Sequence, residues 1–474
     1  MVFKNMHFPK YIVVIVLLLS AVNLKVQGQT VADSIFTLEE FLGYVKQYHP
    51  VVKQAHLIAS EGEAKLLKAR GAFDPKIEVD YGKKEFTGTE YYDKLNAAFK
   101  IPTWYGIEFK ANYENNEGYY LNPEAKVPED GLYSAGVSMS LAKGFLANQR
   151  MTTLKQAKLY RDISLNKQSL AVNEVLYNAV EAYFSWLKYY QEYQVYASFQ
   201  ENARERLANV VVSFEAGDKP AVDTLEASIN LKNRELDVEK SRINYVKSQL
   251  ELSNYLWLEN NTPVELDYSL VPDENSLFIV DQVLNSSLLE VNEELLENHP
   301  KIQTINLEKE QLVLEKRLNT NNLLPKIDAQ YNFLTSDYER INSLTVHNYK
   351  AGLNISMPLF LRKERGDLKL IKLKLQDVEF SLSATKVSLL NKINAVQQEI
   401  DSYETQSAIA QNLVNDYKQL VAFEQERFEL GEGSLFLINY REAKLIETEL
   451  KRIDINNKVL STKAKFAQIL NTLE

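Results

Sequence analysis

The chain has 474 residues, a formal net charge of −10 at pH 7 and no cysteine. The missing cysteine excludes disulfides, thiolate chemistry, cysteine-ligated metals and a lipidated amino-terminal cysteine. The acidic balance and the absence of basic blocks argue against a nucleic-acid partner.

Residues 1–28 have the pattern of a secretory signal peptide. Lys4 and Lys10 give a positively charged start, and Tyr11–Val22 is a short apolar run. Val26 and Gly28 supply small residues at the −3 and −1 positions. The run is shorter than the roughly 20 residues that a membrane-spanning helix needs. We therefore expect the mature chain to leave the cytoplasm without a helical anchor.

The remaining chain contains one succession of segments twice, in residues 35–259 and again in 285–474. The corresponding segments are His49-Pro50 and His299-Pro300, Pro75-Lys76-Ile77 and Pro325-Lys326-Ile327, Gly136 and Gly352, and Phe214 with Gly217 and Phe428 with Gly431. Internal duplication predicts two copies of one extended unit rather than several ordinary domains. We place the first repeat at 29–259, an equatorial linker at 260–298 and the second repeat at 299–474.

Each repeat is expected to contain one very long helix, over 142–213 and 359–428. Residues 145–216 and 367–430 contain neither glycine nor proline, and heptad spacing joins Val172, Ala179 and Trp186. About 70 helical residues would span about 105 Å. Each long helix ends at a tip turn, 214–221 or 429–436, whose glycine can cap it; the turn residues are Phe214, Gly217, Asp218 and Gly431.

The helices that return from the tips are only about half as long as their partners. The helical runs that begin at His49-Pro50 and His299-Pro300 would supply the missing half. We therefore predict a rod with one continuous helix beside two stacked half-helices in each repeat. The linker, residues 30–48 and the carboxyl terminus should lie at the middle of this rod. Aromatic residues between Tyr177 and Phe199 fall at the same level, where packing is favoured over a ligand cage.

Between the helices the apolar period changes to two, in strands within 76–141 and 326–357. Ile77 and Val79 alternate with Glu78 in the first repeat, as Leu353 and Ile355 do with Asn354 in the second. One apolar and one polar face fit membrane β-barrel strands, or a half-buried soluble sheet. Residues 85–130 are either additional barrel strands or an extracellular hairpin. Four or six strands cannot close a barrel, so membrane insertion would require a ring of several copies.

With these segments in place, the chain resembles the TolC family of outer-membrane efflux proteins over nearly all of its mature length. The family's pattern is His-Pro at the start of each repeat, proline ahead of the first strand, and an aromatic-x-x-Gly turn at each helical tip. These features stand here at His49-Pro50 and His299-Pro300, at Asp74-Pro75 and Leu324-Pro325, and at Phe214 to Gly217 and Phe428 to Gly431.

The resemblance implies a mainly α fold with a membrane β-region. The protomer would be a duplicated long-helix unit of an α-barrel, and its strands would contribute to an oligomeric outer-membrane β-barrel. A homotrimer in the outer membrane would extend into the periplasm and dock to a periplasmic adaptor (membrane fusion) protein and an inner-membrane transporter. Its function would be the exit duct of a tripartite efflux or type I secretion system.

In this family polar links between the repeats hold the tips closed. By position Asp223 keeps the acid, whereas Phe428 replaces its hydroxyl partner and Gly433 replaces an arginine. Nearby charges could substitute, although charges on a solvated helix face are the simpler interpretation. The candidate aperture residues are Asp223, Phe428, Glu432, Gly433, Arg441 and Glu442.

No motif for catalysis, a cofactor or a metal is present. His49 and His299 precede prolines at helix starts, which is a structural position, and no two histidines have metal-ligand spacing. We therefore expect a passive conduit rather than an enzyme. The alternative is a soluble periplasmic coiled-coil adaptor or binding protein. The sequence leaves open the cargo, and whether a partner pump is driven by protons or by ATP.

Overall fold

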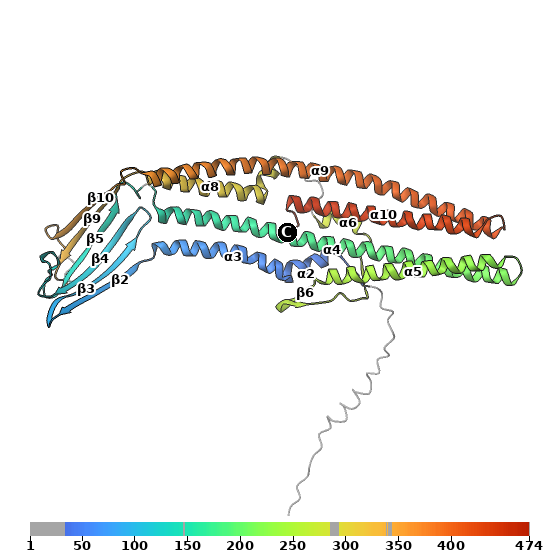
Figure 1. The fold of residues 1–474 in the computed structure, drawn as a ribbon, viewed down its shortest axis with the longest axis horizontal. Coiled ribbons are helices and arrows are strands. Elements are labelled where there is room, and N and C mark those ends of the chain that lie inside the picture. The colour runs from blue at the N-terminus through green and yellow to red at the C-terminus, as the bar shows by residue number, and fades with distance from the viewer. Residues whose placement is uncertain (1–33, 146, 285–292, 338, 340–343, 474) are drawn as a thin grey trace, which may run out of the picture.

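The computed structural model describes residues 34–145, 147–284, 293–337, 339 and 344–473. The signal peptide expected at 1–28 lies outside this range. The described chain is a long rod of helices with one β-sheet at one end (Figure 1).

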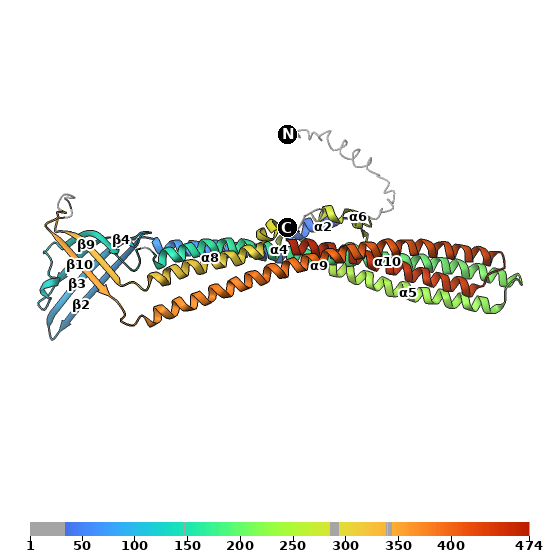
Figure 2. The same ribbon diagram turned by 90° about the horizontal axis from the view of Figure 1, so that it is seen from above.

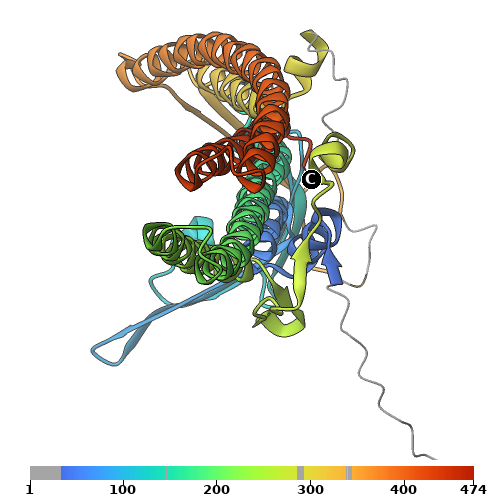
Figure 3. The ribbon, with the colours of Figure 1, turned by 90° about the vertical axis from the view of Figure 1, so that its right-hand side faces the viewer.

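Two continuous helices run the length of the rod, α4 (Gln149–Glu215) and α9 (Arg362–Glu429). With 67 and 68 residues, each is about 100 Å long at 1.5 Å per residue. Two shorter helices lie along each of them. They are α3 (Pro50–Arg70) and α5 (Ala221–Ser253) beside α4, and α8 (Pro300–Asn321) and α10 (Leu435–Leu470) beside α9 (Figures 1 and 2). Viewed along the rod, the helices form a curved layer rather than a closed bundle (Figure 3).

Both long helices begin later than the sequence suggested. Residue 142 was expected to start α4, but Gly144 has a φ of 104°, which breaks the helical path. The helix begins only after Asn148, whose Oδ1 accepts a hydrogen bond of 2.8 Å from the Met151 N–H. Leu361, with a φ of 49°, similarly precedes α9, so that helix begins at 362 rather than 359.

The histidines of the two His-Pro pairs are helix caps. His49 Nδ1 accepts from the Val51 N–H at 3.3 Å, and His299 Nδ1 accepts from the Lys301 N–H at 3.1 Å. The prolines that follow, Pro50 and Pro300, occupy the first helical position, where no N–H is needed. Burial lowers the pKa of both imidazoles, because the charged form is disfavoured away from water.

The stacked half-helices meet at a belt around the middle of the rod. This belt contains α2 (Leu38–Tyr48), α6 (Ser276–Val283), α7 (Glu293–Asn298) and two short strand pairs. The pairs are β1 (Ser34–Phe36) with β8 (Leu270–Pro272), and β6 (Trp257–Leu258) with β7 (Thr262–Pro263).

Aromatic residues of α4 fill the core beneath the belt. Phe184 and Trp186 are fully buried there, as is Phe41 of α2. Tyr183 donates a hydrogen bond of 2.7 Å to the Phe36 carbonyl and accepts one of 3.1 Å from a backbone N–H of the segment after β8. Burial raises the pKa of Tyr183 to about 12. This part of the aromatic stretch is packing, as expected.

A six-stranded antiparallel sheet forms the end of the molecule. Its strands are β2 (Lys76–Phe86), β3 (Thr89–Pro102), β4 (Ile107–Glu117), β5 (Leu132–Ser140), β9 (Lys326–Thr335) and β10 (Tyr349–Ser356). Their order is β10-β9-β5-β4-β3-β2. The 85–130 stretch, left open by the sequence, therefore supplies β3 and β4 as strands within the sheet. A two-residue turn with positive φ at Thr87 and Gly88 joins β2 to β3.

Candidate functional site

The end of the rod opposite the sheet carries two matched tip turns. Gly217 and Gly431 have φ of 82° and 78°, a left-handed conformation that glycine adopts without strain. In each turn the next N–H, of Asp218 or Glu432, donates 2.9 Å back to a carbonyl five residues earlier. These bonds satisfy carbonyls at the end of the helix, as in the Schellman motif. The predicted tip residues therefore build the turns.

Gly433 has a steric reason to be glycine. A Cβ built on it would lie 2.8 Å from the backbone nitrogen of Phe428 and 3.0 Å from its Cα. Any larger side chain, including the arginine that the family resemblance would place here, requires a different turn. This part of the candidate aperture is thus shaped by close backbone approach rather than by charge.

The two tips contact each other through Lys219 and Phe428. The Lys219 ammonium lies 4.0 Å from the centroid of the Phe428 ring, a favourable cation–π geometry. The ring also packs against a small cluster of Val210, Ala227 and Leu435. Phe428 therefore joins the hairpin of α4 and α5 to the hairpin of α9 and α10, although it has no hydroxyl.

Above this contact, a buried polar network joins α4, α5 and α10. Arg206 Nη1 and Nη2 donate to the two carboxylate oxygens of Glu442 at 3.0 and 2.9 Å, and the Glu442 side chain is only 2% exposed. Asn439 accepts from Asn230 and donates to Glu226 at 3.1 Å. Arg206 also approaches Asn439 at 3.4 Å. We call these five residues the tip network.

The structure divides the predicted aperture residues. Glu442 belongs to the tip network, and Phe428 to the contact beneath it. The Asp223 carboxylate has no hydrogen bond or ion pair within the described part of the chain. Glu432 is exposed, and the Arg441 guanidinium lies 5.8 Å from the Tyr440 ring.

Sequence reasoning missed Arg206, Lys219 and Glu226, as well as the two asparagines. Arg206 and Glu442 are 236 positions apart, so no local pattern joins them. The only available signal was the family resemblance, which implies polar links between the two repeats at their tips.

A cavity of about 860 Å³ extends along α4, α9 and α10 behind the tips. Its walls include Phe199, Arg206, Lys418, Phe428 and Glu442. Arg206 and Glu442 of the tip network therefore form part of the wall of this cavity.

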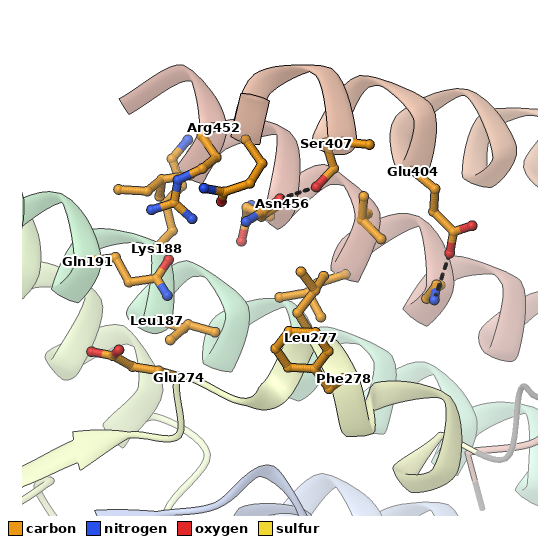
Figure 4. Close-up of a pocket in the computed structure, with 17 residues that line it drawn as sticks. Leu187, Lys188, Gln191, Glu274, Leu277, Phe278, Glu404, Ser407, Arg452 and Asn456 are labelled. Atoms are coloured by element: carbon orange, nitrogen blue, oxygen red, sulfur yellow. Dashed lines mark hydrogen bonds and ion pairs between the residues drawn. The ribbon is translucent and has the colours of Figure 1, made fainter. Parts of the chain in front are cut away.

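A second cavity, of about 440 Å³, lies at the belt among α4, α6, α9 and α10 (Figure 4). Lys463 closes one side, bound to Asp281 at 2.7 Å and Glu404 at 2.9 Å. Burial alone would lower the Lys463 pKa, but hydrogen bonds to the two carboxylates raise it above its ordinary value. Ser407 donates to Asn456 at 2.6 Å across the α9–α10 contact. These bonds fix the belt to the rod.

The sheet has one apolar face that continues across all six strands. The directly paired row Ile77, Phe99, Ala111, Ala135, Phe333 and Tyr349 crosses it from edge to edge. Ile77 is 76% and Leu353 is 64% exposed. A soluble sheet would cover such a face, so the exposed row favours a lipid environment.

The opposite face of the sheet is polar. The adjacent row is Lys76, Lys100, Lys110, Gly136, Asn332 and Lys350. Three of its lysines pair with acids on the same face: Lys100 with Glu78, Lys110 with Glu108 at 3.4 Å, and Lys350 with Glu114 at 3.9 Å. Such a face suits a water-filled interior.

Within the described ranges, no helix combines the length and apolarity needed to cross a bilayer. No group of three or more His, Cys, Asp or Glu side chains in this same part of the chain is arranged to hold a metal ion.

No protein-family model matches the sequence, and no curated protein matches it significantly. Solved structures of outer-membrane channels do share its fold. The Campylobacter jejuni CmeC outer membrane channel has 15% identity and a TM-score of 0.63, with 92% of this chain and 86% of that chain covered. The open state of the Neisseria gonorrhoeae MtrE outer membrane channel has 11% identity and a TM-score of 0.63, with 92% and 89% covered. The Vibrio cholerae outer membrane protein VceC has 11% identity and a TM-score of 0.62, with 92% and 97% covered. The chain therefore has the fold of these outer-membrane channels, and the fold expected from its sequence is confirmed.

Proposed function

We propose that this chain is the protomer of an outer-membrane exit duct, a passive conduit rather than an enzyme. The observation that carries the proposal is the two-faced sheet at the end of a rod about 100 Å long, apolar on one side and charged on the other. In a ring of copies the apolar faces would meet lipid and the polar faces would line water. The curved layer of helices would close into a tube below (Figure 3).

Aromatic residues support a membrane position for the sheet. The rings of Tyr113 and Tyr133 pack on its apolar face with their centroids 4.8 Å apart, towards the end of the sheet far from the helices. Phe73 and Trp104 stack at 5.1 Å where the strands join the helices. Amphipathic rings at both borders of an apolar band are typical of membrane barrels.

Three copies would form the duct, with the sheet in the outer membrane and the rod in the periplasm. The tips would face a periplasmic adaptor and an inner-membrane transporter of a tripartite efflux or type I secretion system. The tip network and the Lys219–Phe428 contact would hold each protomer's two hairpins together in the closed aperture. Asp223 makes no such bond with any residue that the structure describes, so the proposed latch uses Arg206 and Glu442 instead.

Fractionation and bilayer recording test the proposal together. We expect heat-modifiable trimers in the outer-membrane fraction, and single-channel conductance when purified trimers are inserted into planar bilayers. Free periplasmic monomers would support the soluble adaptor instead. Silent bilayers, with insertion verified by protease protection, would contradict the conduit.

A further inference from the structure

The end of the rod that adjoins the sheet is strongly basic. The ten residues nearest the sheet in each of α3, α4, α8 and α9 contain twelve lysines and arginines but only five acids, a net charge of +7. The ten residues nearest the tips in each of α4, α5, α9 and α10 contain four cations and seven acids, a net charge of −3. The helices therefore concentrate positive charge at one level, next to the sheet (Figure 1).

Two lysine pairs of this basic level correspond between the repeats. The pair in α4 is related to the pair in α9 by an offset of 214 residues, the offset that also relates the two tip turns. All four side chains are exposed, and none forms an ion pair with a carboxylate of the described chain. We call these four residues the lysine collar: Lys155, Lys158, Lys369 and Lys372. Bare cations at the same level of both repeats indicate an anionic partner from outside the chain.

The lysine collar lies towards the outer side of the helical layer. Lys372 precedes Lys386 by two heptads, so both lie on one face of α9. Lys386 binds Glu297 of α7 in the belt, and the belt lies on the convex side of the helical layer (Figure 3). Lys158 precedes Val172, in the core beneath the belt, by the same two heptads. In a closed tube these lysines would therefore surround the outside rather than line the interior.

Exposed apolar side chains mark the membrane border just before each pair. Leu359 and Phe360, which precede α9, are 93% and 70% exposed. Trp104 and Phe145, which lie beside the start of α4, are each 47% exposed. Aromatic rings of this kind are typical of the lipid–water boundary. The collar lies six to ten residues inside the two helices, about 9–15 Å from their first residues. Long lysine side chains and a Debye length of about 8 Å bring their charge to the head groups.

We propose that the lysine collar binds the anionic head groups of phospholipids in the periplasmic leaflet of the membrane. The inference rests on the proposed function, because it assumes that the sheet spans the outer membrane. Clusters of cations beside a membrane-spanning segment attract anionic lipids, and lysine binds a phosphate as a compact point charge. Three copies would arrange six lysine pairs around the tube. The bound lipids would hold the rod at a fixed height below the membrane.

Tryptophan fluorescence tests this binding, because Trp104 lies at the membrane border. The other two tryptophans of the chain, Trp186 and Trp257, lie at the belt. Purified trimers are reconstituted in phosphatidylcholine that contains a minor fraction of lipid brominated near the head group, which quenches only nearby tryptophan. The brominated lipid is phosphatidylglycerol in one sample and phosphatidylcholine in the other. We expect the anionic lipid to bind roughly fivefold more tightly at low salt, and this preference to fade at high salt.

Variants locate the binding. Replacing all four collar lysines with glutamine should lower the preference about threefold, and Lys155→Gln/Lys158→Gln, the pair nearest Trp104, should account for most of this loss. The matched control removes four exposed lysines far from the sheet and should keep the preference: Lys232→Gln, Lys240→Gln, Lys392→Gln and Lys451→Gln.

Each outcome decides the proposal. Equal quenching by the two lipids in the unmodified protein, or an unchanged preference in the collar variant, would overturn the lipid site. Loss of trimers by the collar variants in both lipid mixtures would also overturn it, by indicating that the lysines bind a neighbouring copy. Conducting trimers without a preference for anionic lipid refute the collar alone, whereas failure of the unmodified chain to insert refutes the duct itself.

Discussion

Arg206→Ala should loosen the tips while leaving the rest of the rod intact. The substitution leaves Glu442, with 2% of its side chain exposed, as a buried carboxylate without its bidentate partner. Removing one member of a buried ion pair costs about 3–5 kcal/mol. The lower value applies, because the Arg206 side chain is 12% exposed and water can reach the gap. At 1.4 kcal/mol for each tenfold change, about 3 kcal/mol corresponds to roughly a hundredfold in the opening equilibrium.

Hydrogen exchange measures this opening directly. Amides of the tip ends of α4, α5 and α10 should lose about a hundredfold in protection, while those beside the belt should not change. Bilayer conductance of the same variant should rise. The control is Arg206→Leu/Glu442→Leu, which removes both charges and should restore most of the protection. A double variant as exchange-prone as the single one, or unchanged protection in Arg206→Ala, would refute this account of the latch.

Three further changes have defined outcomes. His299→Asn keeps a side chain that can cap α8 but removes an imidazole whose pKa is lowered in the folded state. Such an imidazole makes the unmodified protein less stable as the pH falls below about 6.5, so the variant should lose less stability over that range. Thermal unfolding of the unmodified protein and the variant at pH 7.5 and 5.5 measures the difference. Gly433→Ala should lower the melting temperature, because the added Cβ would lie too close to the backbone of Phe428. The control Gly366→Ala, at an open position within α9, should raise the free energy of unfolding by up to about 1 kcal/mol. Equal shifts of the two melting temperatures in calorimetry would contradict the crowding at Gly433. Leu353→Arg should reduce outer-membrane assembly, at about 2–4 kcal/mol near the bilayer midplane, whereas Asn354→Arg on the inner face should assemble normally; heat-modifiable trimer yield compares them.

The architecture was predictable because its signals are local and occur twice. Heptad spacing in α4 placed Val172, Ala179 and Trp186 in the core, and all three are buried. Alternation identified the strands whichever surface they face. The role of residues 85–130 could not be decided, because membership of a sheet depends on which distant strand pairs with β4, and periodicity carries no information about pairing.

The tips were predicted only in part. The glycine turns depend on backbone conformation, which residue type indicates directly. The latch depends on side chains that meet across two hairpins, such as Arg206 with Glu442, and many charges on α5 and α10 were equally plausible. Asp223 was a candidate by family resemblance alone, and the sequence could not show that a Cβ at position 433 would crowd the backbone of Phe428.

The discontinuity at the belt has a mechanical consequence. Only α4 and α9 continue past the middle of the rod, while their partners stop and restart there at His49 and His299. Within each copy, α4 and α9 are therefore the continuous helices through which a force on the tips would reach the sheet. The half-helices themselves are joined at this level only through the packing and hydrogen bonds of the belt. We therefore expect that a movement of the tips would bend the rod at the belt and leave the sheet unchanged.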